Sequence, residues 1–306
     1  MRILITGVDG FIGTQLAQLL SGTYQVFGLS RSHAGRKAGV TYLKGSLLNS
    51  QDVQRAVRLS KPDQIFHLAA QSNIPLSFQD PAGTVSTNVN GSIVLYEAVR
   101  LLVPKAKVIS VGSSAEYGLA AQSSKKVKED FPTQPTSPYA VSKVAQGLLA
   151  QMYARAYDLR MIHVRPFAII GPAKKGDALT DFCQGIVRIE RGEAKQLKVG
   201  PLFSIRDFVD VRDFVRALKL VAQKGQAGSM YNICSGRGHA LTEMIKILTE
   251  QATAPIQVVQ DQSKRRPADD SRIVGDNSLI QRMGYAPHYT FRQTVVDTLE
   301  YWRHEL

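Results

Sequence analysis

The 306-residue sequence predicts an α/β fold, in which helices cover both faces of a doubly wound parallel sheet. Short apolar runs typical of buried strands lie at 3–5, 25–29, 65–68, 108–111 and 161–164. Longer segments with the apolar periodicity of helices lie at 11–20, 85–102 and 139–157. This alternation is typical of parallel sheets, because each strand needs a crossover, usually a helix, before the next one.

The first predicted strand runs directly into a turn with three regularly spaced glycines. Gly7 permits a tight turn, Gly10 lets a pyrophosphate approach the backbone, and Gly13 allows close packing of helix on strand. The helix that starts at Phe11 and Ile12 would face the phosphates with its amino end. This strand–turn–helix context predicts a Rossmann-type dinucleotide site; the alternative is a glycine-rich turn without a ligand.

The end of the second strand, where the type of dinucleotide is selected, carries Ser30, Arg31 and Ser32 and no acidic residue. An acid there would bind the adenosine ribose hydroxyls and favour NAD. A guanidinium can instead pair with a 2′-phosphate, and Arg36 and Lys37 follow closely. We therefore expect NADP (NADPH) rather than NAD; the alternative is that Arg31 stacks on adenine.

Tyr139 and Lys143 stand four residues apart, so a helix would place both side chains on one face. A cation that close favours the phenolate, which predicts a lowered tyrosine pKa and proton exchange with a carbonyl oxygen near neutral pH. With 11 tyrosines in the chain, one such pair is expected by chance. The pair gains weight from the motifs upstream of it.

Four motifs, in this order and spacing, resemble those of the extended short-chain dehydrogenase/reductases, a family that modifies nucleotide-sugars. They are Thr6-Gly7-x-x-Gly10-x-x-Gly13, His67-Leu68-Ala69-Ala70, Gly112-Ser113-Ser114 and Tyr139-x-x-x-Lys143. The likeness covers essentially the whole chain. Within the family, the segments at 69–72, 112–118, 206–213 and 231–236 most resemble the GDP-4-keto-6-deoxy-mannose reductases, which make GDP-rhamnose.

The resemblance implies three catalytic residues: Ser113 to polarise the substrate carbonyl, Tyr139 to protonate it, and Lys143 to bind the nicotinamide ribose. It implies cofactor contacts at Gly7, Gly10, Phe11, Ile12, Gly13, Ser30, Arg31, Ser46, Leu47, Leu68, Ala69, Ala70, Asn88, Val111, Tyr139, Lys143 and Pro166. It implies substrate contacts at Gln71, Ser113, Ser114, Glu116, Arg206 and Arg266. The alternatives are a cap or core amide for Asn88 and surface positions for the two arginines. Ser46 stands where the family usually carries an aspartate.

The expected reaction is reduction of a nucleotide-sugar 4-keto group, from GDP-4-keto-6-deoxy-D-mannose to GDP-D-rhamnose. The 4,6-dehydratases of the family carry an acid where this chain has Ala115, and a methyl group cannot move protons. The cysteine of the enzymes that make GDP-fucose is also missing there. An NDP-sugar 4-epimerase, another 4-keto-sugar reductase and a non-catalytic dinucleotide sensor are the alternatives. Ala168 replaces a family asparagine, which leaves the base and the hexose open.

Composition excludes several other classes of protein. The net charge is +13, but aromatic residues do not interleave with the basic runs at 125–128 and 264–266, so we expect no nucleic-acid partner. Cys183 and Cys234 lack the neighbours of a metal cluster, and we expect no metal. No apolar stretch has the length of a membrane span, and the chain starts with a strand rather than a signal sequence. A cytoplasmic protein without a membrane partner is the expectation.

The rhythm of strands and helices breaks after Pro166. We predict a dinucleotide-binding domain at 1–165, to which 207–234 returns, and a smaller mixed α/β substrate lobe at 166–206 and 235–306. The helices at 85–102 and 139–157 carry apolar residues on more than one face. By resemblance they would pair in a homodimer through a four-helix bundle; the alternative is that the substrate lobe covers the second face.

Overall fold

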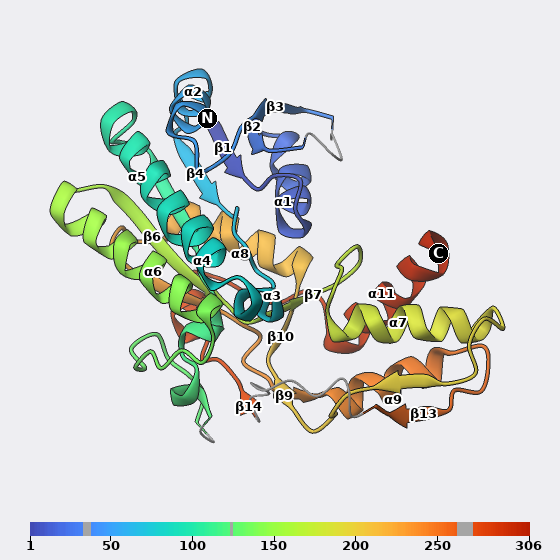
Figure 1. Ribbon diagram of the computed structural model, residues 1–306. Helices are drawn as coiled ribbons and strands as arrows, with labels where there is room; N and C mark the ends of the chain where they lie inside the picture. Colours follow the sequence, from blue (N-terminus) through green and yellow to red (C-terminus); the bar gives the residue numbers. More distant parts are fainter. Residues whose placement is uncertain (33–37, 123–124, 262–271) are drawn as a thin grey trace.

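The computed structural model, which describes residues 1–32, 38–122, 125–261 and 272–306, is built around a seven-stranded parallel sheet. The order of its strands is β11-β6-β5-β4-β1-β2-β3. Figure 1 labels β6, β4, β1, β2 and β3 of this sheet. Their bounds are β1 Arg2–Thr6, β2 Gln25–Ser30, β3 Val40–Lys44, β4 Gln64–His67, β5 Lys107–Val111, β6 Arg160–Pro166 and β11 Met230–Ile233. The predicted doubly wound parallel sheet is confirmed.

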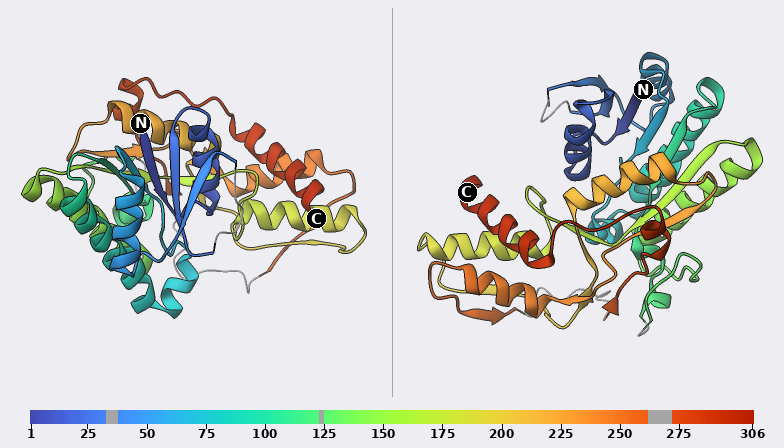
Figure 2. Two further views of the ribbon diagram at one scale, coloured as in Figure 1. Left: turned by 90° about the horizontal axis from the view of Figure 1, so that it is seen from above. Right: turned by 180° about the vertical axis from the view of Figure 1, so that it is seen from behind.

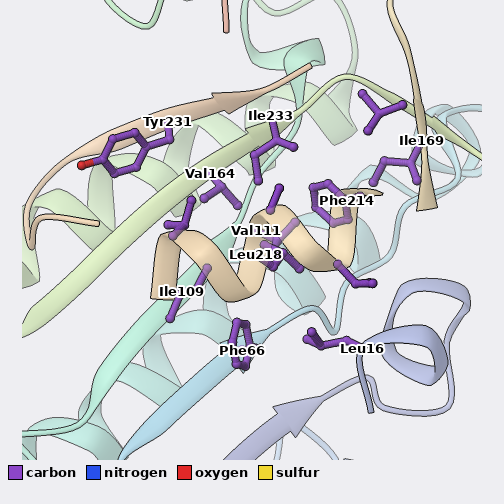
Figure 3. Packing of buried hydrophobic residues seen from close by; sticks show 14 of the residues in the cluster. Leu16, Phe66, Ile109, Val111, Val164, Ile169, Phe214, Leu218, Tyr231 and Ile233 are labelled. Atoms are coloured by element: carbon purple, nitrogen blue, oxygen red, sulfur yellow. The ribbon is translucent and has the colours of Figure 1, made fainter. Parts of the chain in front are cut away.

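Helices cover both faces of this sheet, and each face has its own apolar core. Ile3 and Ile5 of β1 pack toward α1 (Phe11–Ser21) and α8 (Val211–Lys224). Leu4, between them, packs toward the other face, which is covered by α2 (Ser50–Ser60), α5 (Gly91–Leu102) and α6 (Pro138–Tyr157). Side chains alternate across a strand, so an uninterrupted apolar run is what a strand with two covered faces requires. Figure 3 shows Phe214 and Leu218 of α8 against the sheet residues Ile109 and Val111.

The strand order reverses at β1, which lies between β4 and β2. From this point the chain builds β2 and β3 outward on one side, and β4, β5 and β6 outward on the other. Open α/β sheets bind ligands outside the carboxyl ends of the strands at such a reversal. The glycine turn after β1 and the loops that follow β4 and β5 are therefore in the right place for a site.

A second lobe packs beside the sheet and carries the C-terminus (Figure 2). Three helices, α7 (Ala178–Glu190), α9 (Leu241–Gln251) and α11 (Phe291–Glu305), share a core of their own. The smaller strands are β7 Ala168–Ile170, β8 Leu197–Val199, β9 Ile205–Arg206, β10 Phe208–Asp210, β12 His239–Ala240, β13 Val258–Gln260 and β14 Arg272–Ile273. The short helix α10 (Ser278–Arg282) instead packs against β11 of the large sheet. The domain boundaries drawn from the sequence stay a prediction.

The segment at 206–213 holds distant parts of the chain together through its aspartates. Buried Asp207 accepts hydrogen bonds from the backbone N–H groups of Ser235, Gly236 and Gly275. Asp210 caps the amino end of α8 by accepting from the N–H of Arg212. Asp213 accepts hydrogen bonds from the N–H groups of His288 and Tyr289, so each of the three acids in these eight residues has backbone donors as partners.

The helix expected at 85–102 begins earlier than predicted and is not uniform. It starts with α4 (Pro81–Val85), after the short α3 (Ile74–Gln79), because the Asp80 side chain caps its amino end and proline suits the first helical position. A π-turn at Ser86–Asn90 then separates α4 from α5. Single π-turns inside helices are often found at functional sites, because they turn side chains away from the regular spacing.

Candidate active site

Two glycines around the turn between β1 and α1 stand at positions with no room for a side chain. Gly7 has φ +70°, and a Cβ there would lie 2.9 Å from the Cα of Ala69. A Cβ on Gly13 would lie 2.1 Å from the carbonyl oxygen of Gly7. Gly10 is the N-cap of α1 and has no side chain to cap it, so the first N–H groups of the helix point toward the loop. Such a turn fits the pyrophosphate of a dinucleotide.

A directed chain of hydrogen bonds connects this turn to the π-turn through buried His67. Ser92 donates to the carbonyl of Asn88 (2.6 Å), so its Oγ accepts from Nε2 of His67 (2.9 Å). Nδ1 of His67 then accepts from the hydroxyl of Thr6 (2.9 Å), whose oxygen accepts from the N–H of Ala69 (3.2 Å). Burial, followed by the charge of Lys143, lowers the pKa of His67 to about 3. The ring is therefore neutral and fixes the loop after β4 against the glycine turn.

Asn88 and Gln71 hold each other instead of projecting into open space. The buried amide of Asn88 accepts from the N–H of Gln71 (2.8 Å) and donates to its carbonyl (2.9 Å) and to Ser142 (2.9 Å). The side chain of Gln71 in turn bonds to Thr84 and to the backbone of Asn73. In this arrangement Asn88 is a core amide that braces the loop after β4, and the amide of Gln71 is engaged within that loop.

Tyr139 lies in the first turn of α6, which begins at Pro138 because Ser137 caps the helix. Its phenol lies near the side chain of Ser113, two residues after the end of β5. Burial raises the pKa of Tyr139 to about 12, against the opposite effect of Ser113. The expected lowering of this pKa is therefore wrong for this arrangement, because desolvation outweighs the neighbouring groups. The phenol keeps its proton at neutral pH, as a proton donor must.

Lys143, one turn further along α6, is buried and held by two acceptors. Its Nζ donates to the carbonyl of Val111 (2.8 Å) and to Oε1 of Gln146 (2.8 Å), and Gln146 donates to Ser110 (3.0 Å). Burial lowers the pKa of Lys143 to about 8, against the opposite effect of Glu116. An ammonium has three donors. With two used on groups in the described part of the chain, one is left for a ribose hydroxyl.

Glu116, predicted to contact the substrate, is instead fully buried beneath the loop that carries Ser113, which corrects that prediction. Its Oε1 accepts from the N–H of Ser113 (2.9 Å) and from Nε2 of His163 (3.0 Å), and Oε2 accepts from Nε of Arg165 (2.7 Å). Burial opposes ionisation, but His163, Arg165 and the Ser113 N–H together hold the pKa of Glu116 below its ordinary value. A Cβ on Gly112 would lie 2.1 Å from Oε1, so only glycine leaves room for the carboxylate.

Gln146, His163 and Arg165 were not predicted as site residues. Gln146 stands three residues after Lys143 and so shares its face of the helix, a spacing that was available in the sequence. His163 and Arg165 stand two residues apart on β6, so both side chains lie on the same face of the strand, and both contact Glu116. Their segment resembles an ordinary buried strand, and nothing local indicates their partner.

The remaining predicted residues fall into four groups. Leu68, Ala69, Ala70, Val111, Ser114 and Pro166 lie at or just after the carboxyl ends of β4, β5 and β6. Ser46 and Leu47 follow β3, where the Ser46 hydroxyl accepts from the N–H of Leu48 (3.3 Å). Arg206 lies on β9 in the second lobe, away from the sheet. Arg266, Arg36 and Lys37 lie outside the described residues, and the contacts predicted for all these residues stay predictions.

Two further expectations concern what the chain carries beyond this site. In the described ranges, no helix combines the length and the hydropathy needed to cross a membrane. Within the same residues, no group of three or more histidine, cysteine or acidic side chains is arranged to hold a metal ion.

Comparison with known proteins identifies the family. A family model described as GDP-mannose 4,6 dehydratase matches residues 4–298. The chain is 30% identical to GDP-6-deoxy-D-mannose reductase of Pseudomonas aeruginosa over 304 residues, which cover 98% of this chain and 97% of the relative. It is 28% identical to UDP-glucose 4-epimerase of Mycolicibacterium smegmatis, with 100% and 99% covered.

Solved structures agree with this assignment. RMD from Pseudomonas aeruginosa complexed with NADPH superposes with a TM-score of 0.87 at 28% identity, covering 100% of both chains. UDP-glucose 4-epimerase of Thermus thermophilus in complex with NAD superposes with a TM-score of 0.90 at 26% identity, again over 100% of both chains. Since the family model matches almost the full length, the chain belongs to the GDP-mannose 4,6 dehydratase family, within the extended short-chain dehydrogenase/reductases that its motifs resemble.

Proposed function

We propose that this protein reduces the 4-keto group of a nucleotide-sugar, converting GDP-4-keto-6-deoxy-D-mannose to GDP-D-rhamnose. The observation that carries the proposal is the grouping of three side chains, in which the buried phenol of Tyr139 lies near Ser113 and one helical turn from Lys143. Similarity to GDP-6-deoxy-D-mannose reductase over 98% of the chain supports the substrate class. NADH and NADPH supply the same hydride, so the proposal holds for either.

Each of the three side chains has a separate task. A bound nicotinamide supplies the hydride. The hydroxyl of Ser113 donates to the substrate carbonyl and stabilises the charge that develops on its oxygen. Tyr139 gives its proton to that oxygen, and the ammonium of Lys143 stabilises the phenolate that is left. Glu116 holds the backbone of Ser113 in place and touches no reactant.

Dehydration is disfavoured although the family model carries that name. In the short 3-10 turn Ser114–Glu116, the position of the dehydratase acid is taken by Ala115. Glu116 is the carboxyl of this turn, and it is buried and paired with Arg165 and His163. Neither residue is suited to transfer a proton to a sugar. A 4-epimerase is the second candidate, because the structural likeness to UDP-glucose 4-epimerase is equally strong.

The test is a turnover assay with GDP-4-keto-6-deoxy-mannose and either reduced dinucleotide, followed by nicotinamide absorbance, with identification of the product sugar. A reductase consumes one reduced dinucleotide per product, whereas an epimerase turns over without net consumption. Tyr139→Phe should lower kcat by about 10²–10⁴-fold and leave dinucleotide binding intact. Tyr153→Phe on the same helix, where the phenol donates to Glu97, is the matched control and should be close to wild type.

An unchanged rate in Tyr139→Phe would refute the assignment of Tyr139 as the proton donor. If the wild type binds a dinucleotide but turns over neither substrate class, the non-catalytic sensor becomes the better description.

Two structural proposals accompany this function. The lobe at 166–206 and 235–306 would hold the sugar-nucleotide, with Arg206 toward its phosphates. A homodimer would form through α5 and α6, which expose the apolar side chains of Leu101, Val141 and Leu148. Large apolar side chains exposed on neighbouring helices support an interface of the four-helix type.

A further inference from the structure

A carboxylate from the glycine turn lies at the end of β2. Oδ2 of Asp9 accepts hydrogen bonds from the hydroxyls of Ser30 (2.5 Å) and Ser32 (2.9 Å). The N–H of Ser32 donates to Ser30 Oγ (3.2 Å), which closes the end of the strand into a compact turn. In the sequence Asp9 stands 21 positions before Ser30, so no acid is visible where the second strand ends.

The pairing of β1 with β2 explains why these residues meet. Thr6 is opposite Leu29 in the parallel register, and the N–H of Gly7 donates to the carbonyl of Leu29 (3.1 Å). The residues that follow each strand therefore leave the sheet side by side. Gly10, the next residue after Asp9, is at the N-cap position of α1, at the helix end where a pyrophosphate would bind. Asp9 thus lies between the pyrophosphate position and the end of β2, where the adenosine ribose of a dinucleotide is bound.

We propose that Asp9 binds the hydroxyls of the adenosine ribose and makes the protein selective for NAD(H) over NADP(H). This inference rests on the dinucleotide site of the proposed function. Oδ2 is occupied by the two serine hydroxyls, whereas Oδ1 accepts no hydrogen bond from the described residues and is available to a ribose hydroxyl. A 2′-phosphate would instead bring its negative charge up to this carboxylate.

The two serines strengthen the same selection. Each uses its hydroxyl proton on Asp9, so neither hydroxyl proton is available for a phosphate oxygen. Arg31, from which NADPH was expected, is exposed. An exposed ion pair contributes little, whereas a like charge next to a fixed carboxylate is strongly unfavourable. This inference is therefore the opposite of the cofactor preference that the sequence of β2 suggests.

Equilibrium binding of NADH and NADPH to the full chain tests this selection without any turnover. Titrations followed by nicotinamide fluorescence should give a dissociation constant for NADH at least about tenfold lower than for NADPH. Asp9→Asn keeps the size of the side chain and an acceptor for the serines, and should bring the two constants to within about threefold. Asp63→Asn is the matched control, because Asp63 accepts from the N–H of Arg2 at the amino ends of β1 and β4, and its ratio should equal that of wild type.

The outcomes separate this inference from the proposed function. If wild type binds NADPH as tightly as NADH or more tightly, the inference is overturned and the reductase proposal stands. If Asp9→Asn retains the wild-type ratio, another group makes the selection and the inference is also overturned. If neither dinucleotide binds, the proposed function fails. If circular dichroism shows that Asp9→Asn has not folded, the ratio of the NADH and NADPH dissociation constants of the wild type still tests the inference.

Discussion

Glu116→Gln should destabilise the protein far more than its conservative size change suggests. The side chain of Glu116 is fully buried, and that of Arg165 is only 6% exposed. Gln keeps the volume but removes the charge, so the guanidinium remains buried without its anion. Whichever way the new amide turns, its NH2 group faces a donor, either the N–H of Ser113 or Nε of Arg165. Removal of one partner of a buried ion pair costs about 3–5 kcal/mol.

The assay is thermal unfolding followed by circular dichroism. For a chain of this size, a loss of about 3–5 kcal/mol lowers Tm by roughly 6–10 °C. Glu250→Ala is the control, because Glu250 pairs with Arg292 on the surface and its removal should change the stability by about 1 kcal/mol or less. A change in Tm for Glu116→Gln no larger than that of the control would refute the energetic role of the cluster.

The pH dependence provides an independent check with a definite sign. The pKa of Glu116 is lower in the folded protein than in the unfolded chain. Its contribution to stability is therefore present above the ordinary carboxyl pKa and is lost as the pH falls through the lower, folded value. The Tm of wild type and of Glu116→Gln should differ at neutral pH and converge below about pH 4. A difference that widens in acid would contradict the pKa argument.

Three more predictions concern Lys143, the glycine turn and the proposed dimer. Burial lowers the pKa of Lys143 to about 8, so kcat for ketone reduction should fall by about tenfold per pH unit above that value as the ammonium is lost, and a flat profile would contradict it. Gly13→Ala should weaken dinucleotide binding at least about tenfold in a fluorescence titration, because the new Cβ would lie 2.1 Å from a backbone oxygen. Gly22→Ala, at the other end of α1 with nothing within 4 Å, should bind normally. Leu148→Asp on α6 should halve the mass measured by light scattering, whereas Leu59→Asp on α2, similarly exposed at 55%, should not.

Much of the fold and part of the site follow from local sequence. Apolar runs and helical periodicity predicted the doubly wound parallel sheet, because a strand buried on two faces must be apolar throughout, but they did not give its seven strands. The glycine spacing predicted a turn that a Cβ would block, and the spacing of Tyr139 and Lys143 placed both on one helix. These features depend on residues within a few positions of one another, so their geometry is fixed by the regular repeat of the backbone.

The electrostatic character of the site was decided by the tertiary structure. Asp9 meets Ser30 across 21 positions, and Glu116 meets His163 and Arg165 across 47 and 49. The pKa of Tyr139 depends on how deeply packing buries its phenol, which its spacing from Lys143 does not determine. Hydrogen bonds between distant residues and the loss of water around a side chain arise only when the sheet brings separate strands together. The sequence therefore determined which groups are present, and the folded chain determined which of them carry charge and what they touch.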